Sequence, residues 1–436
     1  MPRRYVFALT LLLVWFLVTG ALYALRTPRW QAPDEPAHFN YVRHVAQHWT
    51  PPVLEPGCYD QAYLERLKSR RFPPSMSVDA ICYEAHQPPL YYYLAAVPYR
   101  LAVALGFDPL LAVRLFSVVL GAGVVLVSAA IGLHLFPERP LVAVSAAGVV
   151  ATVPMHVAML ASANNDALAE LVLGLAVWQM VRLLRRPRTV PRDWYLLGVL
   201  LGAGMLTKTT TYMAIPMALA VAWWRWRGSP GGSFLRTAGA PLAVALLFAL
   251  PWFARNSLTY GGLDVLGLRR HEAVVVGQPR TAQWLQELGA LRLAKRFVFT
   301  TFHSFWGQFG WMAAPLPSAV YSVLWLVSAL GLAGVVLRLW SARRLWPTST
   351  PSAYRLLLLW VGLNLLAYGW YNLTFVQHQG RYLFPSLPAL ALFLVLGLHE
   401  WFVPRYRPLV SVALVGGLAG LAWWSLLVVL PGLAPG

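Results

Sequence analysis

The densest group of chemically capable side chains is the run Ala-Pro-Asp-Glu-Pro-Ala-His at residues 32–38. Asp34 and Glu35 are adjacent carboxylates between two prolines, and His38 follows closely. A carboxylate held there can act as general base toward a hydroxyl group, or can bind a divalent cation. The same residues also suit a helix N-terminus, with both carboxylates capping the amphipathic segment Pro36–Trp49. The two interpretations are compatible, because a cap also fixes carboxylate geometry.

Two further polar clusters could complete a site. His86 and Gln87 precede a Pro-Pro-Leu-Tyr-Tyr stretch and could donate hydrogen bonds to a phosphate or a sugar, although a histidine in a polar loop is often incidental. Asn165 and Asp166 end the run Ser-Ala-Asn-Asn-Asp and open an apolar helix. They are either a helix cap or a second polar cluster that faces Asp34 across a cavity.

Cationic side chains near the ends of apolar runs are candidates for binding phosphate. Lys208 lies among four threonines, an arrangement that suits phosphate, or else it extends its ammonium group to the interface. Arg255 lies in Pro-Trp-Phe-Ala-Arg-Asn, and Arg381 lies in His-Gln-Gly-Arg-Tyr-Leu-Phe-Pro together with His378 and Tyr382. A lipid-linked phosphate and ordinary headgroup contact are the two explanations for these arginines.

The composition decides which elements position these residues. Of the 436 residues, 58% are hydrophobic and 12% are charged, about half the roughly 25% of soluble domains. Apolar runs of about 20 residues recur along the chain, which indicates a polytopic membrane protein. A soluble enzyme, a disordered chain and a secreted mini-protein are excluded. The net charge of +19 would suggest nucleic-acid binding in a soluble protein, but here it must first be tested as a topology signal.

About eleven membrane spans are predicted, and the two short ones, Trp194–Leu206 and Tyr212–Trp224, are expected to be short helices that meet at a tight turn. They are Tyr5–Leu25, Leu110–Phe136, Leu141–Leu160, Ala167–Leu184, Trp194–Leu206, Tyr212–Trp224, Pro241–Phe253, Ala319–Leu339, Leu356–Thr374, Leu383–Phe402 and Leu409–Leu430. The segment Pro88–Gly106 is interpreted as an interfacial helix, because a span there would put the arginine cluster at 182–192 outside, against the positive-inside rule. Most positive charge then lies on the cytoplasmic side, so no nucleic-acid partner is expected.

This topology makes residues 1–436 a single membrane domain with a cytoplasmic N-terminus and two large extracytoplasmic loops, 26–87 and 256–317. The acidic residues gather at the outer ends of the spans, so the site is expected at the outer membrane surface. Cys58 and Cys82 are the two cysteines of the sequence, and both fall in the first outer loop. In an oxidising compartment a disulfide is the better interpretation, with two unpaired packed thiols as the alternative. Their isolation argues against metal binding.

In their joint order these motifs resemble the type-C (GT-C) membrane glycosyltransferases, namely the bacterial relatives of protein O-mannosyltransferases and lipid A aminoarabinose transferases. The resemblance covers most of the chain. It is carried by the Asp-Glu pair after the first span, the His-x-Pro-Pro-Leu-Tyr stretch, the polar motif ending in Asp166, and Lys208 in the turn between short helices. The Pro-Trp-x-x-Arg-Asn and Gly-Arg-Tyr-Leu-Phe-Pro stretches complete it.

The resemblance implies an all-α fold and an inverting sugar transfer in the bacterial plasma membrane, from a polyprenyl-phosphate donor to a hydroxyl of a lipid, glycan or protein. It assigns the base to Asp34, with Glu35 as a neighbour that shares the role. Lys208, Arg255 and Arg381 would hold the departing phosphate, and Asp166 would organise acceptor or metal. Some relatives have a phosphate-binding lysine where this chain has Gln87. A divalent cation, Mg²⁺ or Mn²⁺, is left open.

Two other classes of function compete with the enzyme. A transporter or flippase of a lipid-linked glycan would place charges at the bilayer midplane and would often contain inverted repeats, which the sequence does not suggest. A non-catalytic membrane scaffold is the third class. Sugar transfer by an Asp34→Asn variant separates the enzyme from both.

Overall fold

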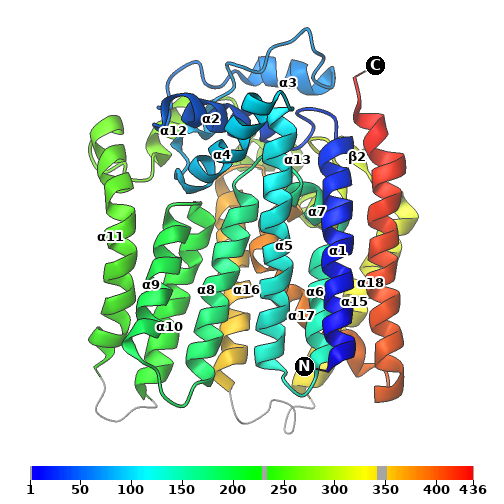
Figure 1. Ribbon diagram of the computed structural model, residues 1–436. Helices are drawn as coiled ribbons and strands as arrows, with labels where there is room; N and C mark the ends of the chain where they lie inside the picture. Colours follow the sequence, from blue (N-terminus) through cyan, green and yellow to red (C-terminus); the bar gives the residue numbers. More distant parts are fainter. Residues whose placement is uncertain (1, 228–232, 341–350, 436) are drawn as a thin grey trace.

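The protein is described by a computed structural model covering residues 2–227, 233–340 and 351–435. Figure 1 shows a bundle of upright helices, with a layer of shorter helices at one end and the N-terminus at the other. One small antiparallel sheet pairs β1 (Gln308–Phe309) with β2 (Ala314–Pro315). The all-α architecture predicted from the sequence is confirmed.

Within the described residues, eight helical segments are long and apolar enough to cross a membrane. They are α1 (Arg3–Arg26), α5 (Pro109–Leu135), α8 (Asp166–Arg185), α11 (Phe234–Tyr260), α15 (Ser318–Trp340), α16 (Pro351–Thr374), η4 with α17 (Gly380–Ser386 and Leu387–Glu400), and the final segment. The final segment comprises η5 (Pro404–Tyr406), α18 (Arg407–Trp424), a π-helical turn η6 (Ser425–Val429) and η7 (Leu430–Leu433). The chain is an integral membrane protein.

The expected span Leu141–Leu160 is broken rather than continuous. It forms α6 (Pro140–Thr152) and α7 (Pro154–Leu160), which meet at an angle of 68°. Pro154 has no backbone N–H and pushes Val153 into an extended conformation, which ends α6. The bend directs the end of α7 to the polar segment 161–165, which approaches Glu35.

The count of eleven spans is not confirmed, although every expected segment contains helix. Nine pass the length test if the bent pair counts as one span. The two remaining segments are the short helices that the sequence suggested, α9 (Pro191–Met205) and α10 (Ala214–Arg227). They are joined through a turn at 206–208 and the 3₁₀ turn η2 (Thr209–Met213). This turn carries Lys208.

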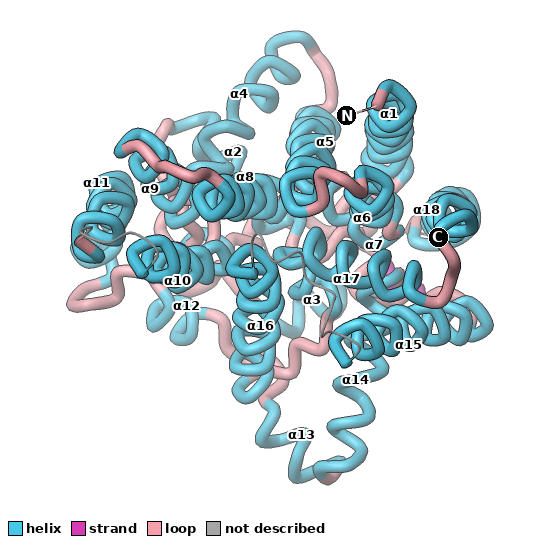
Figure 2. The backbone as a smooth tube through the Cα atoms, turned by 90° about the horizontal axis from the view of Figure 1, so that it is seen from below, coloured by secondary structure: helices cyan, strands magenta, loops and turns pink. Residues whose placement is uncertain are grey.

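The outer layer comes from two stretches of the chain. The first contains α2 (Glu35–His48), α3 (Gln61–Ser69), η1 (Tyr83–His86) and α4 (Leu90–Leu105). The second contains α12 (Leu268–Val274), α13 (Thr281–Leu288) and α14 (Ala290–Trp306). Helix α4 corresponds to the interfacial helix expected at Pro88–Gly106 and is too short for a span. Figure 2 shows α13 projecting beyond the bundle.

The second loop begins later than expected. Helix α11 does not end near Phe253 but continues to Tyr260, so that Arg255 and Asn256 are helical. The helix passes through Pro241 and Pro251, because membrane helices tolerate internal prolines when neighbouring groups satisfy the freed carbonyls.

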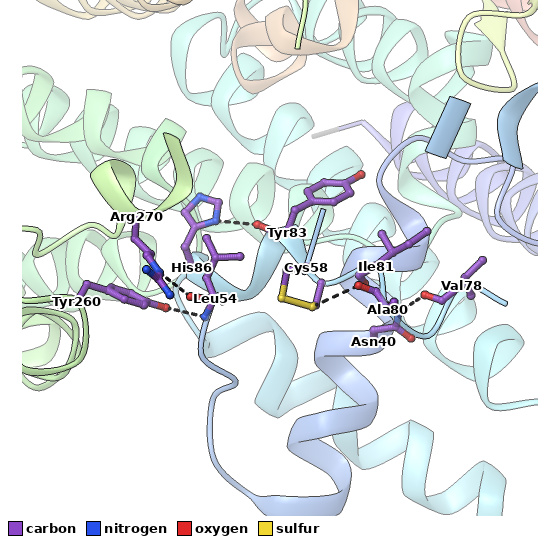
Figure 3. Close-up of a disulfide and its surroundings, with 11 residues drawn as sticks. Asn40, Leu54, Cys58, Val78, Ala80, Ile81, Tyr83, His86, Tyr260 and Arg270 are labelled. Carbon is purple, nitrogen blue, oxygen red and sulfur yellow. Dashed lines mark hydrogen bonds between the residues drawn. A yellow bond between two sulfur atoms is a disulfide. The ribbon is translucent and has the colours of Figure 1, made fainter. Parts of the chain in front are cut away.

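The disulfide between Cys58 and Cys82 is present, as predicted. Figure 3 shows it beside Asn40, whose side-chain amide donates to the carbonyl oxygens of Val78 and Ile81 at 2.7 and 2.9 Å. On the other side of the bond, Leu54 donates its N–H to the Tyr260 hydroxyl at 3.2 Å. The loop is thus fixed both to α2 and to the end of α11.

Removing the disulfide with Cys58→Ser/Cys82→Ser is expected to destabilise the protein by about 3 kcal/mol, since the bond closes a loop of about 25 residues. Thermal unfolding of the purified protein in detergent measures the effect. Addition of a reductant to the wild type should lower its melting temperature to that of the variant. Equal melting temperatures for the oxidised wild type and the variant would contradict a stabilising role.

Candidate active site

Asp34 is held in an unusual backbone conformation at the start of α2. It occupies the N-cap position with φ 65° and ψ −2°, in the left-handed region that few non-glycine residues adopt. Its side chain does not cap the helix within the described structure. Instead, Oδ1 accepts a hydrogen bond from the Tyr83 hydroxyl at 2.8 Å, and Oδ2 accepts one from Nη2 of Arg381 at 2.5 Å. The capping interpretation is therefore wrong for this carboxylate.

Glu35 has a different environment from its neighbour. It is fully buried, and both of its oxygens accept hydrogen bonds from the guanidinium of Arg114 on α5, at 2.8 and 2.6 Å. Oε2 also accepts from the N–H of Trp30, and Oε1 accepts from the N–H of Ala163. Because these donors engage both oxygens, the geometry does not favour Glu35 as a second base. Glu35 instead ties α2 to α5 and to the segment after α7.

A pocket of about 290 Å³ opens beside Asp34. Asp34, Arg381 and Tyr382 line it, as expected for site residues. Tyr83 and Glu84 also line the pocket, although neither was predicted as a site residue. Both belong to the polar stretch that contains His86. The other lining residues are Pro33, Tyr59, Gln61, Leu64, Glu65, Lys68, His271, Gln278, Pro279, Trp311, Met312, Tyr371, Val376, Gln377 and Gln379.

A second polar cluster adjoins the pocket. Lys208 Nζ and Asp166 Oδ1 form an ion pair at 2.5 Å, joining the turn after α9 to the start of α8. The Asn165 amide donates to the carbonyl oxygen of Thr207 at 3.2 Å and to Oε1 of Gln87 at 3.4 Å. Asn165 occupies the N-cap position of α8, but Asn164 Oδ1 accepts the N–H of Asp166. The expected cap therefore comes from the neighbouring asparagine.

His38 lies between the two clusters. Burial lowers its pKa, and the surrounding charges act in both directions: Glu84, Asp34 and Asp166 raise it, whereas Lys208 lowers it. Its Nδ1 is 2.8 Å from the Tyr92 hydroxyl. His38 thus lies within electrostatic reach of both Asp34 and Asp166, so the two acidic positions lie in the same region of the structure.

Three expected site residues lie elsewhere. Arg255 donates to the carbonyl oxygens of Pro51 and Pro52, so it fastens α11 to the first outer loop. His378 packs edge-on against Trp284 and Phe297, on the α13–α14 side.

The third is His86, whose ring packs against that of His271 at a tilt of 48°, with centroids 4.4 Å apart. His86 is buried, and its Nδ1 lies 3.1 Å from the carbonyl oxygen of Tyr83. It supports η1, while the neighbouring residues Tyr83 and Glu84 reach the pocket. The sequence identified the correct stretch but not the side chains that face the cavity.

Asp34 carries its negative charge at neutral pH. Burial raises its pKa, but the charge and hydrogen bond of Arg381 outweigh this effect and lower the pKa to about 2. His38 and the hydrogen bond from Tyr83 also lower it. The carboxylate is therefore ionised and oriented, and its charge is balanced by Arg381.

Acidification is expected to destabilise the protein through His86 and His271. Burial lowers the pKa of each histidine from 6.5 to about 4. The unfolded chain binds more protons between these values, so the stabilisation present above pH 6.5 is lost as the pH falls toward 4. Melting temperatures measured between pH 7 and pH 4.5 should fall less steeply for His86→Gln/His271→Gln than for the wild type. Parallel curves would rule out these histidines as the cause.

The expectation of a divalent cation is untested. Among residues 2–227, 233–340 and 351–435, no group of three or more His, Cys, Asp or Glu side chains is placed to hold a metal ion. The acidic side chains considered for that role, Asp34 and Asp166, each pair with a cationic side chain.

Comparison with known proteins supports the resemblance. A family model described as dolichyl-phosphate-mannose-protein mannosyltransferase matches residues 86–254. This stretch contains Gln87, Asp166 and Lys208, whereas Asp34 and Arg381 lie outside it. No curated protein matches the chain in sequence.

Solved structures share the fold. The crystal structures of ArnT from Cupriavidus metallidurans, in the apo state and bound to undecaprenyl phosphate, match with TM-scores of 0.54 and 0.56 and identities of 18% and 16%. Each match covers 96% of this chain and 64% of the ArnT chain. Archaeal oligosaccharyltransferase AglB from Archaeoglobus fulgidus, in complex with an inhibitory peptide and a dolichol-phosphate, has a TM-score of 0.54 at 14% identity. That match covers 95% of this chain and 55% of AglB.

This chain therefore spans less than two thirds of the length of these structures. With the family model, they confirm the type-C fold that the motif order suggested.

Proposed function

We propose that this protein is an inverting glycosyltransferase that moves a sugar from a polyprenyl-phosphate donor to a hydroxyl acceptor. The reaction would occur at the extracytoplasmic face of a bacterial plasma membrane, with the N-terminus in the cytoplasm. The observation that carries the proposal is Asp34, an oriented, ionised carboxylate in a polar pocket next to Arg381 and the Lys208–Asp166 pair. ArnT, which shares the fold, has been solved with undecaprenyl phosphate bound.

In the proposed reaction, the oxygen of the acceptor hydroxyl attacks the anomeric carbon of the donor sugar, and Asp34 removes the proton of that hydroxyl. The bond between that carbon and the phosphate oxygen breaks, and the lipid phosphate leaves with the electron pair. Attack from the face opposite the phosphate inverts the anomeric configuration. The charge that develops on the phosphate requires cations, and Arg381 and Lys208 are the cationic side chains of the two clusters.

The ion pair between Asp34 and Arg381 has a mechanistic consequence. A carboxylate with a pKa near 2 is a weak base, whereas general bases work best when their pKa is close to the operating pH. A donor phosphate bound at Arg381 would share its charge, which weakens the hold on Asp34 and raises its basicity. Donor binding would thus prepare the base for the acceptor.

Lys208→Met is expected to raise the KM for the donor by about 10- to 100-fold, the usual effect of losing one charge-assisted hydrogen bond. The assay varies the donor at saturating acceptor. Lys295→Met, which removes an exposed lysine on α14, serves as the matched control. Thermal unfolding is followed in parallel, because Asp166 loses its partner. An unchanged donor KM would remove Lys208 from the phosphate site.

The direct test incubates the purified protein with undecaprenyl-phosphate-linked sugars, together with candidate lipid, glycan and peptide acceptors. Release of undecaprenyl phosphate and a new glycosidic bond of inverted configuration are expected with at least one pair. The same protein in liposomes is tested for movement of the lipid-linked sugar between leaflets. Lipid movement without bond formation would replace the enzyme with a flippase.

A further inference from the structure

The pocket contains hydrogen-bond acceptors that lack donors. Among the buried side-chain atoms of the described residues without a hydrogen-bond partner, two belong to the pocket lining: Oε2 of Glu84 and Oε1 of Gln278. A buried acceptor without a partner costs about 1–3 kcal/mol. Whatever displaces water from this pocket must therefore bring donors of its own.

The contacts of its neighbours place Gln278 at the outer rim of the pocket, on the side away from the membrane-spanning helices. Its neighbour Gly277 approaches Gln61 at the start of α3, and Pro279 accepts the N–H of Val376 at 3.0 Å. Figure 1 shows α3 as part of the outermost layer, above the upright helices. A donor anchored by its lipid tail would hold its phosphate near Arg381 and Lys208. The rim of the pocket would then remain available to the second substrate, the acceptor.

The chemistry of the lining narrows the class of this second substrate. The phosphodiester of a lipid-linked sugar has no O–H group at neutral pH, so it cannot donate hydrogen bonds to these two acceptors. A sugar ring presents several hydroxyl donors along its edge and an apolar C–H face. The pocket wall contains amide groups that can bond to the hydroxyls, from Gln61 and Gln377. It also contains aromatic rings that can pack against the C–H face, from Tyr59, Tyr371 and Trp311.

We infer that the pocket contains a carbohydrate subsite, in which Glu84 and Gln278 accept hydrogen bonds from hydroxyls of a glycan acceptor. The inference rests on the proposed function, which makes the bound compound the acceptor substrate. It narrows that acceptor from any hydroxyl compound to a sugar. The two residues determine acceptor specificity, while Asp34 remains the base.

Binding without turnover tests the subsite. Saturation-transfer NMR is recorded on the full chain in detergent with methyl glycosides of mannose, glucose, galactose and N-acetylglucosamine. Their permethylated forms, which cannot donate from their hydroxyl positions, and N-acetyl-threonine amide are the comparison probes. At least one free glycoside is expected to bind at millimolar concentration, and its permethylated form and the threonine probe are expected to bind at least about fivefold more weakly.

Matched variants assign the binding to the two acceptors. Gln278→Ala and Glu84→Gln should each weaken glycoside binding by about fivefold or more, whereas Gln286→Ala and Glu287→Gln on exposed α13 should leave it unchanged. Because Gln278 lies at the rim, its variant is informative even if Glu84→Gln folds poorly. No glycoside binding, equal binding by all variants, or preference for the threonine probe would overturn the subsite.

A third measurement separates the acceptor from the donor sugar. A farnesyl-phosphate-linked sugar is added to the glycoside-bound Asp34→Asn variant, which cannot turn the pair over, and the glycoside should remain bound. Displacement would show that the hydroxyls belong to the donor and would overturn the acceptor assignment. None of these measurements requires catalysis. Glycoside binding can therefore be observed even if sugar transfer is not detected, and it can be absent even if transfer is detected, so the two proposals are tested separately.

Discussion

Replacing Asp34 with asparagine is expected to lower sugar transfer by about 10³-fold or more, with little change in folding or expression. The substitution keeps the size of the side chain but removes the carboxylate that takes the proton from the acceptor hydroxyl. Positioned general bases contribute 10²- to 10⁴-fold to reaction rates. Arg381 retains a hydrogen bond to Oε1 of Gln379 at 2.8 Å and the electrostatic attraction of Asp166, so its charge keeps both an acceptor and a nearby anion. The rate is measured from the release of polyprenyl phosphate at saturating substrates.

Asp79→Asn is the matched control for this variant. Asp79 is an exposed residue of the same outer loop, paired with Arg43 at 2.6 Å, and its substitution should leave transfer unchanged. If Asp34→Asn retains full transfer, Asp34 is not the base. Glu84, the pocket carboxylate that lacks an ion-pair partner among the described residues, would then be examined next.

Arg114→Met is expected to have the largest effect on stability, about 3–5 kcal/mol, because it leaves Glu35 as a buried charge without its cation. The side chains of this pair are 4% and 0% exposed. Removing both charges with Glu35→Gln/Arg114→Met should recover part of the loss, since no buried ion then remains. Thermal unfolding in detergent, followed by intrinsic fluorescence, measures all three proteins.

The surface pair between Arg29 and Asp108 is the control for this experiment. Its side chains are 59% and 42% exposed, and exposed pairs contribute about 0–1 kcal/mol. Arg29→Met should therefore shift the melting temperature little. A similarly small shift for Arg114→Met would show that Glu35 is not held by Arg114, and would reopen a catalytic role for Glu35.

Much of the architecture could be predicted from the sequence because its signals are local. A run of about 20 apolar residues must cross the bilayer or be buried, whatever surrounds it, and α1, α5 and α15 follow the expected runs closely. The cysteine pair was predictable from its loop. The bend at Pro154 was readable in principle, because proline ends a helix by its own geometry.

The site was only partly predictable, because direction and partnership depend on packing. Lys208 and Asp166 lie 42 residues apart in sequence and meet through the turn after α9, a pairing that the sequence did not predict. Arg255 and Arg381 looked alike, each an arginine at the outer end of an apolar run. Only the fold sends Arg255 to the carbonyl oxygens of the first loop and Arg381 to Asp34.

The sequence by itself determined a helical membrane protein with an acidic pair after its first span and a disulfide-closed loop. Only the tertiary structure distinguished the two acids. Asp34 and Glu35 are neighbours, yet the left-handed conformation of Asp34 turns its carboxylate into the pocket, while the first turn of α2 turns Glu35 into the interior. Arg381 and Arg114 complete these environments from 347 and 79 residues away. A carboxylate's role follows from the charges and solvent around it, which adjacent positions in a chain need not share.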